Sequence, residues 1–382
     1  MMRQVASPGV LVGAVLLSLV FGSIHAYSAL MAPLEQAFGT SRANVSLGYS
    51  LAIASLTCGV FASAFLLRVP ASLLALVSGG AAAAGLGIGA AGNSLLLFLL
   101  GYGVIFGAAN GVAYSLFLNR AAYAMPAAQG WSAGIVTACY GLGAAISALG
   151  FDLALAHASV QSVLLELAGV VAMASGIAAV LFRGGAGAVA VAARAAPARS
   201  YHKLVIWLWT VYFLGAAGGL MVIAHASGIV LAAGLGSVAT GLAPSSVALG
   251  NIAGSLAGGP LGERWPSHRA LAAPLLLLAG AMALLLILPE AGLAAVALCG
   301  AAYGALIAVV PAVIRKITGS EKFAPVFGRV FTAWGLAGLS APFAAGVLFD
   351  TFSGYGVAVG LAIAAAGAGA LAALFWPPTS AR

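Results

Sequence analysis

Long runs of apolar residues, separated by short polar or basic connections, follow one another along the whole chain. A helix needs about 20 apolar residues to cross the hydrocarbon core of a bilayer, and twelve runs reach that length. The pattern therefore predicts an all-α membrane protein with twelve transmembrane helices. The predicted spans are residues 9–33, 43–67, 70–91, 95–119, 130–152, 160–182, 204–232, 237–259, 270–289, 291–314, 326–349 and 355–376.

The composition supports a membrane protein. Hydrophobic residues make up 63% of the chain and charged residues only 6%, whereas a soluble domain carries about 25% charged residues. The first apolar run is longer than the apolar core of a signal peptide, which has roughly 7–15 residues. We therefore expect this run to be a retained helix. The three cysteines, Cys58, Cys139 and Cys299, lie inside apolar runs without metal-ligand spacing, so we expect neither a zinc site nor a disulfide framework.

The basic residues indicate an orientation. With the N-terminus in the cytoplasm, 14 of the 15 lie in the tails or in inner connections, and only Arg42 lies outside. This bias is the positive-inside rule. It predicts that both termini lie on the cytoplasmic side of a cell membrane, which we expect to be a bacterial inner membrane. It also accounts for the net charge of +8 without a nucleic-acid partner.

The chain contains an internal repeat. The segment Gly107-Ala108-Ala109-Asn110-Gly111 in the fourth span matches Gly300-Ala301-Ala302-Tyr303-Gly304 in the tenth. The pairs His25-Ala26 and Phe151-Asp152 likewise match His225-Ala226 and Phe349-Asp350. These matches, in order and at similar offsets, predict two parallel six-helix halves, residues 1–182 and 204–382, joined by a cytoplasmic linker at 183–203.

Two such halves are the architecture of the major facilitator superfamily, which the chain resembles over its whole length. The loop Gly259-Pro260-Leu261-Gly262-Glu263-Arg264-Trp265-Pro266-Ser267-His268-Arg269 is similar to that family's cytoplasmic loop motif between spans. Its acid and bases, with Arg120 at the end of the fourth span, are the expected cytoplasmic gate: Glu263, Arg264, Arg269 and Arg120.

Within the superfamily, the chain most resembles the oxalate/formate antiporter and monocarboxylate transporter group. Three stretches carry this resemblance: Tyr27 to Leu34 with Phe38 to Arg42, Gly130 to Ile135, and the segment from Tyr303 to Asp350. The resemblance implies a carboxylate substrate. However, Ser255 stands where that group has an anion-binding arginine after Asn251, and residues 330–349 contain no basic residue. A monocarboxylate therefore fits better than a dicarboxylate.

Ionisable residues inside a membrane are functional candidates because they are costly there. The candidates for proton coupling are His25, Glu166 and His225. For each, the alternative is a structural group: a hydrogen-bonded histidine, or a carboxyl that reaches the membrane surface. The candidates for substrate binding are polar and aromatic residues of cavity-facing helices, with helix packing as their alternative: Tyr27, Asn110, Tyr114, Tyr140, Asn251, Ser255, Tyr303 and Trp334.

These features predict a secondary active transporter that works by alternating access. Its expected substrate is a small organic solute, a monocarboxylate that can travel with a proton. The chain has no phosphate-binding loop and no catalytic constellation, so we expect neither an ATP-driven pump nor an enzyme, and no cofactor. We expect a monomer with the bilayer and its solute as partners. An exporter of hydrophobic or neutral compounds and a non-transporting membrane sensor on the same fold stay open as alternatives.

Overall fold

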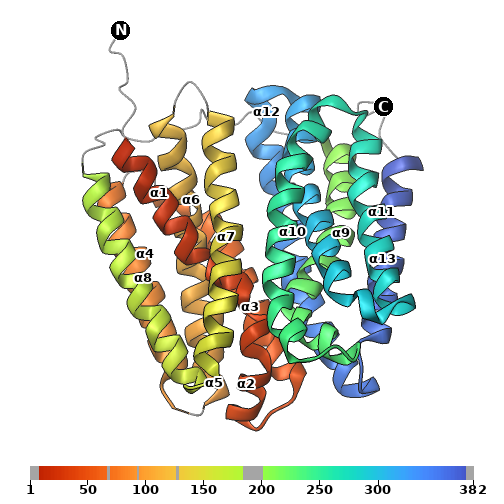
Figure 1. The fold of residues 1–382 in the computed structure, drawn as a ribbon. Coiled ribbons are helices and arrows are strands. Elements are labelled where there is room, and N and C mark those ends of the chain that lie inside the picture. The colour runs from red at the N-terminus through yellow and green to blue at the C-terminus, as the bar shows by residue number, and fades with distance from the viewer. Residues whose placement is uncertain (1–7, 67–68, 93, 126–128, 184–200, 376–382) are drawn as a thin grey trace. The chain divides into compact units, whose positions relative to one another are not determined.

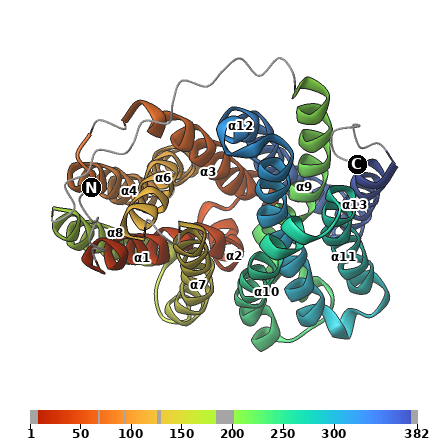
Figure 2. The ribbon, with the colours of Figure 1, turned by 90° about the horizontal axis from the view of Figure 1, so that it is seen from above.

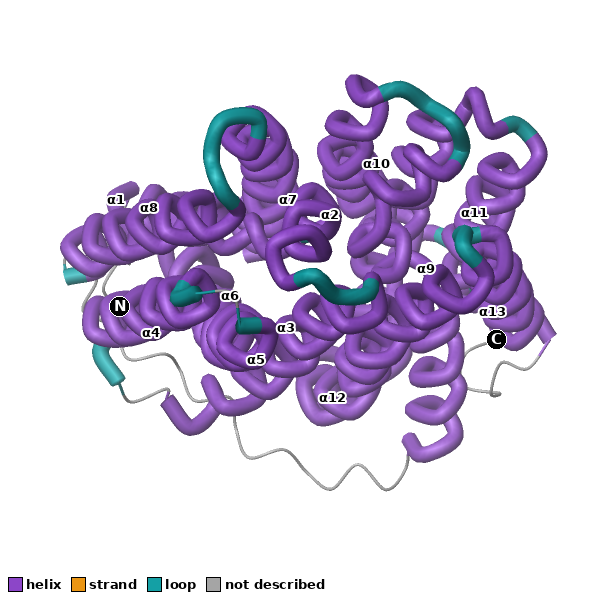
Figure 3. Tube along the Cα trace, turned by 90° about the horizontal axis from the view of Figure 1, so that it is seen from below, coloured by secondary structure: helices purple, strands orange, loops and turns teal. Residues whose placement is uncertain are grey.

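The computed structural model describes residues 8–66, 69–92, 94–125, 129–183 and 201–375. Within these residues all regular structure is helical (Figure 3). The described helices fall into two compact units: residues 1–40 with 47–191, and residues 41–46 with 192–382. The first turn of one helix, Ser41–Ser46, thus clusters with the second unit. Most of the predicted linker, residues 184–200, lies outside the described residues.

The first unit contains helices from the N-terminal part of the chain, red to yellow-green in Figure 1. α4 packs along α8, and α1 packs against α6, α7 and α8. Two predicted spans are divided into shorter elements, because a 3₁₀ stretch interrupts the first and a π-helical stretch interrupts the fourth. The elements are α1 (Pro8–Phe21), η1 (Gly22–Ala26), α2 (Ser28–Phe38), α3 (Arg42–Ala62), η2 (Ser63–Leu66), α4 (Ala71–Ala90), α5 (Leu95–Phe98), η3 (Leu99–Phe106), α6 (Gly107–Ala124), α7 (Gln129–Leu155) and α8 (Val160–Phe182).

The second unit contains the helices drawn green to blue in Figures 1 and 2. Its longest element, α12, combines the predicted tenth and eleventh spans, and it bends at Gly319, where φ is 71°. A left-handed backbone at this position favours glycine. The elements are α9 (His202–Ala232), α10 (Ser237–Arg264), α11 (Ser267–Ile287), η6 (Pro289–Ala291), α12 (Gly292–Phe352) and α13 (Gly356–Phe375).

The structure confirms the predicted fold class, an all-α bundle of membrane-spanning length. Eleven segments among the described residues are long and apolar enough to cross a membrane. The exception is α10, which lies where the eighth span was predicted. It is 28 residues long, but six glycines and two prolines lower its hydropathy.

The repeated glycine motifs lie at equivalent helix contacts in the two units. In the first unit, Gly107 and Gly111 of α6 pack against the backbone of α3, where an added Cβ at Gly107 would come within 2.8 Å of the Ala52 Cα atom. In the second unit, Gly300 and Gly304 of α12 pack against α10 in the same manner. Small residues let membrane helices approach closely, which gives the sequence repeat a physical reason.

Candidate functional site

The break in the first predicted span positions His25. Residues Gly22–Ala26 form a 3₁₀ turn between α1 and α2, and this turn packs against α7. Gly22 permits the approach, because a Cβ there would overlap the backbone carbonyl of Tyr140. His25 is half-buried. Its Nδ1 atom lies 2.7 Å from the Tyr49 hydroxyl of α3, and its ring meets the Tyr140 ring edge-on at 5.5 Å.

A hydrogen-bonded chain extends from this point into the bundle. The Tyr140 hydroxyl donates to Asn110 Oδ1 at 3.0 Å, and Asn110 Nδ2 donates to the Phe21 carbonyl at 2.8 Å. Phe21 is the last residue of α1, where the regular helical ladder ends. Asn110 is fully buried, so both polar ends of its amide are satisfied in an apolar surrounding, as burial requires. The asparagine thereby stabilises the break that holds His25.

Aromatic rings complete this group. Tyr27 lies 5.4 Å from both Tyr49 and Tyr102, measured between ring centroids, and Tyr114 meets Tyr140 edge-on at 5.5 Å. Five of the predicted residues therefore lie together in the first unit. Tyr49 was not among the predicted residues, because the sequence does not show that its side chain lies on the face of α3 that contacts His25. We call the group of six the histidine–tyrosine cluster: His25, Tyr27, Tyr49, Asn110, Tyr114 and Tyr140.

The cluster can donate hydrogen bonds and exchange a proton. Among the residues that the structure describes, no partner is found for the Nε2 atom of His25. If the Tyr49 hydroxyl donates to Nδ1, Nε2 carries the proton of the neutral ring and can donate; in the other tautomer Nε2 can accept a proton. The cluster therefore offers neutral, reversible hydrogen bonding.

The second unit places its predicted residues in two pairs. The Trp334 indole Nε1 donates to the Tyr303 hydroxyl at 2.7 Å, and Gly219 of α9 packs on the Tyr303 ring. Ser255 Oγ lies 3.2 Å from Asn251 Oδ1 and 3.3 Å from the Gly304 carbonyl. Ser255, which stands where an arginine was expected, thus lies in the contact between α10 and α12.

His225 has a different environment from His25. It is fully buried, with Nε2 2.9 Å from the Pro342 carbonyl and Nδ1 2.9 Å from the Tyr355 hydroxyl. A carbonyl can only accept, so Nε2 carries the proton and Nδ1 accepts from Tyr355. Both ring nitrogens have partners within the second unit. Nε2 also lies 3.4 Å from the Ser46 hydroxyl.

The other predicted residues lie apart from the histidine–tyrosine cluster. Glu166 is exposed on α8, on the same face as the exposed apolar side chains Leu165 and Met173. Arg120 is buried near the end of α6, with its guanidinium 5.3 Å from the Tyr123 ring.

The predicted gate segment, residues 259–269, covers the end of α10 and the first turn of α11, so most of the predicted loop is helical and only Trp265 and Pro266 lie between the helices. Glu263, Arg264 and Arg269 are all exposed. Lys316 of α12, which was not predicted, donates to the backbone carbonyls of Glu263 at 3.2 Å and Trp265 at 2.8 Å. This lysine therefore fixes the loop to α12. Over the described residues, no group of three or more His, Cys, Asp or Glu side chains could hold a metal ion.

Comparison with known proteins supports the fold. No protein-family model and no curated protein matches the chain. It is similar to the crystal structure of a bacterial homologue of the human lysosomal transporter Spinster, in an inward-facing and occupied conformation. That match has 15% identity and a TM-score of 0.72 over 98% of this chain and 97% of the other. The unoccupied inward-facing conformation of such a homologue matches with 14% identity and a TM-score of 0.67, over 97% and 95% of the two chains.

These likenesses confirm the predicted all-helical fold, and eleven described helices are long and apolar enough to cross a membrane. The resemblance to the oxalate/formate and monocarboxylate group stays a prediction.

Proposed function

We propose that this protein is a secondary transporter that moves a small organic solute, a monocarboxylate, across a bacterial inner membrane by alternating access. The observation that carries the proposal is the histidine–tyrosine cluster. Polar residues are costly inside a membrane and mark substrate or proton pathways. Here they gather where a membrane helix is interrupted, and transporter sites typically lie beside such discontinuous helices.

A monocarboxylate suits the chemistry of the cluster. Hydroxyl and imidazole groups can hold a carboxylate or a carboxylic acid by hydrogen bonds. An unpaired charge at the centre of a membrane helix costs about 2.5–3.5 kcal/mol or more. A proton that travels with a monocarboxylate removes this cost, whereas a dicarboxylate would need a second one. This argument favours proton-coupled transport of a monoanion.

His25 is the proton carrier in this proposal. Its Nδ1 atom is held by Tyr49, while Nε2 can take up a proton or contact the solute. His225 uses both nitrogens in hydrogen bonds within its own unit, which favours a structural role. Glu166 lies on an exposed face of α8, which favours contact with lipid or with the membrane surface.

Uptake into proteoliposomes tests the proposal. Labelled lactate, pyruvate, formate and oxalate would be offered with and without an inward proton gradient. We expect saturable uptake of a monocarboxylate that the gradient accelerates, and little uptake of oxalate. In His25→Gln, which keeps a hydrogen-bonding side chain but cannot carry the proton, we expect the gradient dependence to disappear.

His202→Gln is the matched control, because His202 is exposed at the start of α9. It should transport like the wild type. No saturable uptake of any of the four acids would refute the monocarboxylate proposal. A gradient dependence that persists in His25→Gln would exclude His25 as the carrier.

A second candidate, export of hydrophobic compounds, is favoured by a row of aromatic rings on α12. Phe323, Phe327, Phe331 and Trp334 contact one another in succession, with centroid distances of 5.2, 5.5 and 5.2 Å. Such a row can hold flat apolar molecules without charge. Gradient-driven efflux of a lipophilic dye, together with no uptake of the four acids, would select this function. No flux in either assay would favour the non-transporting sensor.

A further inference from the structure

A pocket of about 610 Å³ opens at one end of the second unit. The ends of α9, α11, α12 and α13 surround it, and all its lining residues belong to that unit. It shares no residue with the histidine–tyrosine cluster, which belongs to the first unit. The pocket therefore needs an explanation of its own.

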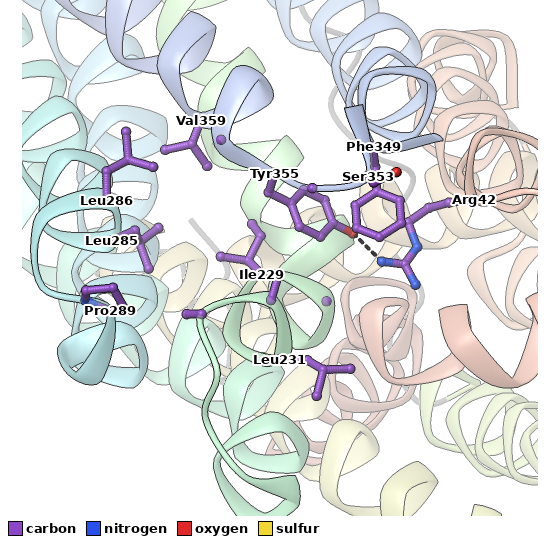
Figure 4. A pocket seen from close by; sticks show the side chains of 15 residues that line it. Arg42, Ile229, Leu231, Leu285, Leu286, Pro289, Phe349, Ser353, Tyr355 and Val359 are labelled. Carbon is purple, nitrogen blue, oxygen red and sulfur yellow. Dashed lines mark hydrogen bonds between the residues drawn. The ribbon is translucent and has the colours of Figure 1, made fainter. Parts of the chain in front are cut away.

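The two sides of the pocket differ in chemistry. Figure 4 shows the Arg42 guanidinium at one side and the aliphatic side chains of Leu285, Leu286 and Val359 at the other. Arg42 is the only charged residue among those that line the pocket, and most of the others are apolar. A ligand that matches this lining has an anionic group at one end and a hydrocarbon part at the other.

The charged end is held in place by aromatic contacts. The Arg42 guanidinium lies 4.0 Å from the centroid of the Phe349 ring, and Nη1 donates to the Tyr355 hydroxyl at 3.0 Å. Tyr355 in turn is fixed by His225. An arginine ordered in this way loses less conformational entropy when it binds an anion.

Among the described residues of the second unit, Arg42 is the lysine or arginine that lies at this end. Asp350 accepts from the backbone N–H groups of Arg42 and Ala43, at 3.2 and 2.8 Å, and so caps the first turn of α3. Glu290, next to the pocket-lining Pro289, is exposed. The other described lysines and arginines of the second unit lie toward the far ends of its helices or at the bend of α12: Lys203, Arg264, Arg269, Arg315, Lys316, Lys322 and Arg329.

Large apolar side chains around the pocket are exposed. Leu231, Leu286, Ile287 and Phe352 have exposed fractions of 57%, 48%, 80% and 60%. A surface of this kind next to a helix end belongs in the boundary between lipid headgroups and hydrocarbon. A ligand from the bilayer can therefore enter the pocket from the side without crossing water.

We propose that this pocket binds an anionic membrane phospholipid. The headgroup phosphate contacts the Arg42 guanidinium, and the first part of an acyl chain lies along Leu285, Leu286 and Val359. Basic pockets between membrane helices recognise lipid headgroups in this way, and arginine matches the geometry of phosphate. A soluble anion would use the arginine but not the apolar wall. A zwitterionic lipid such as phosphatidylcholine has the phosphate too, but it also brings a choline cation next to Arg42.

Native mass spectrometry of the full-length purified protein tests this. Phosphatidylglycerol, phosphatidylcholine and inorganic phosphate would each be titrated onto delipidated wild type, Arg42→Gln and Ala232→Trp. Arg42→Gln removes the charge. Ala232→Trp fills the pocket from an exposed position that lines it and leaves Arg42 unchanged. The matched controls are Arg315→Gln and Ala364→Trp, both at exposed positions outside the pocket.

We expect one phosphatidylglycerol to bind the wild type about tenfold more tightly than phosphatidylcholine, because the choline cation offsets the phosphate charge that Arg42 contacts. Both pocket variants should lose this preference, and both controls should keep it. Circular dichroism and the melting temperature would show that the variants are folded. Equal phosphatidylglycerol affinity in wild type and both pocket variants would overturn the proposal. So would displacement of the lipid by millimolar inorganic phosphate, because the ligand would then be a free anion.

Discussion

The close contact between α10 and α12 gives a quantitative prediction for Gly254→Ala. Glycines and alanines pair along this contact at intervals of four residues, and Gly254 lies against Ala301 at its middle. A Cβ at position 254 would lie 2.8 Å from the Ala301 Cα atom and closer still to its carbonyl. Favourable carbon–carbon contacts lie at about 3.5–4.0 Å. Because the obstructing atoms belong to the backbone, the two helices must separate by roughly 1 Å.

The expected cost follows from two opposing contributions. Overpacking of a well-packed contact costs about 1–3 kcal/mol, while replacing glycine with alanine in a helix gains about 1 kcal/mol. We therefore expect Gly254→Ala to lower the free energy of unfolding by up to about 2 kcal/mol, on the basis of these two magnitudes. Gly259→Ala is the matched control. It lies on the same helix, but no atom would lie within 4 Å of its added Cβ, so only the gain should remain.

Thermal exposure of a buried cysteine measures this effect. Cys299 is buried on α12 beside the contact, while Cys58 is exposed and Cys139 is half-buried. With Cys58 and Cys139 replaced by serine, a thiol-reactive fluorophore reports the opening of α12 during heating. We expect the midpoint to fall by several degrees in Gly254→Ala and to stay the same or rise in Gly259→Ala, relative to the parent. A midpoint for Gly254→Ala at or above the parent's would refute the close approach of these helices.

Three further predictions concern side chains that form one or two hydrogen bonds. Tyr140→Phe removes the donor to Asn110 Oδ1. We expect the initial rate of solute uptake to fall about tenfold, which corresponds to the cost of one unsatisfied buried acceptor. An unchanged initial rate would contradict this. Asp350→Ala removes the cap of α3 and should lower the free energy of unfolding by about 0.5–2 kcal/mol, measured by thermal melting with Asp350→Asn as an intermediate case. Lys316→Met removes two bonds to the loop after α10; we expect faster trypsin cleavage there, and an unchanged rate would show that the lysine does not hold the loop.

The helices of this protein were predictable from the sequence because the bilayer imposes one strong constraint. A segment in hydrocarbon must satisfy its own backbone hydrogen bonds, so apolar length alone predicts a helix. The repeat of the Gly107–Gly111 segment at Gly300–Gly304 also had a physical basis that the structure confirms, since both segments let helices approach closely. The same constraint does not show which contacts the side chains inside a span make. It also identifies α10 less clearly, because its glycines and prolines make its hydropathy lower than that of the other spans.

The site was predictable only in part. Asn110 and Tyr140 stood out as polar residues in apolar spans, but their hydrogen bond joins positions 30 residues apart. Nothing in the sequence indicated that Tyr49 would hold His25, because hydropathy does not record which face of a helix a side chain lies on. The contrast between the two histidines was also hidden, since the partner of His225 is Tyr355, 130 residues later.

Composition thus determined that this chain is a membrane bundle of helices, and the spacing of repeated segments predicted two related halves. The tertiary structure decided where the first span breaks, which polar side chains share a cluster, and that Arg42 faces a pocket lined by apolar residues of the second unit. The physical reason is the range of the forces involved. Burial of apolar surface in a bilayer acts on every residue of a span, so it produces a pattern that can be recognised in the sequence. A hydrogen bond, in contrast, depends on two atoms placed within about 3 Å, and only the packed helices determine that distance.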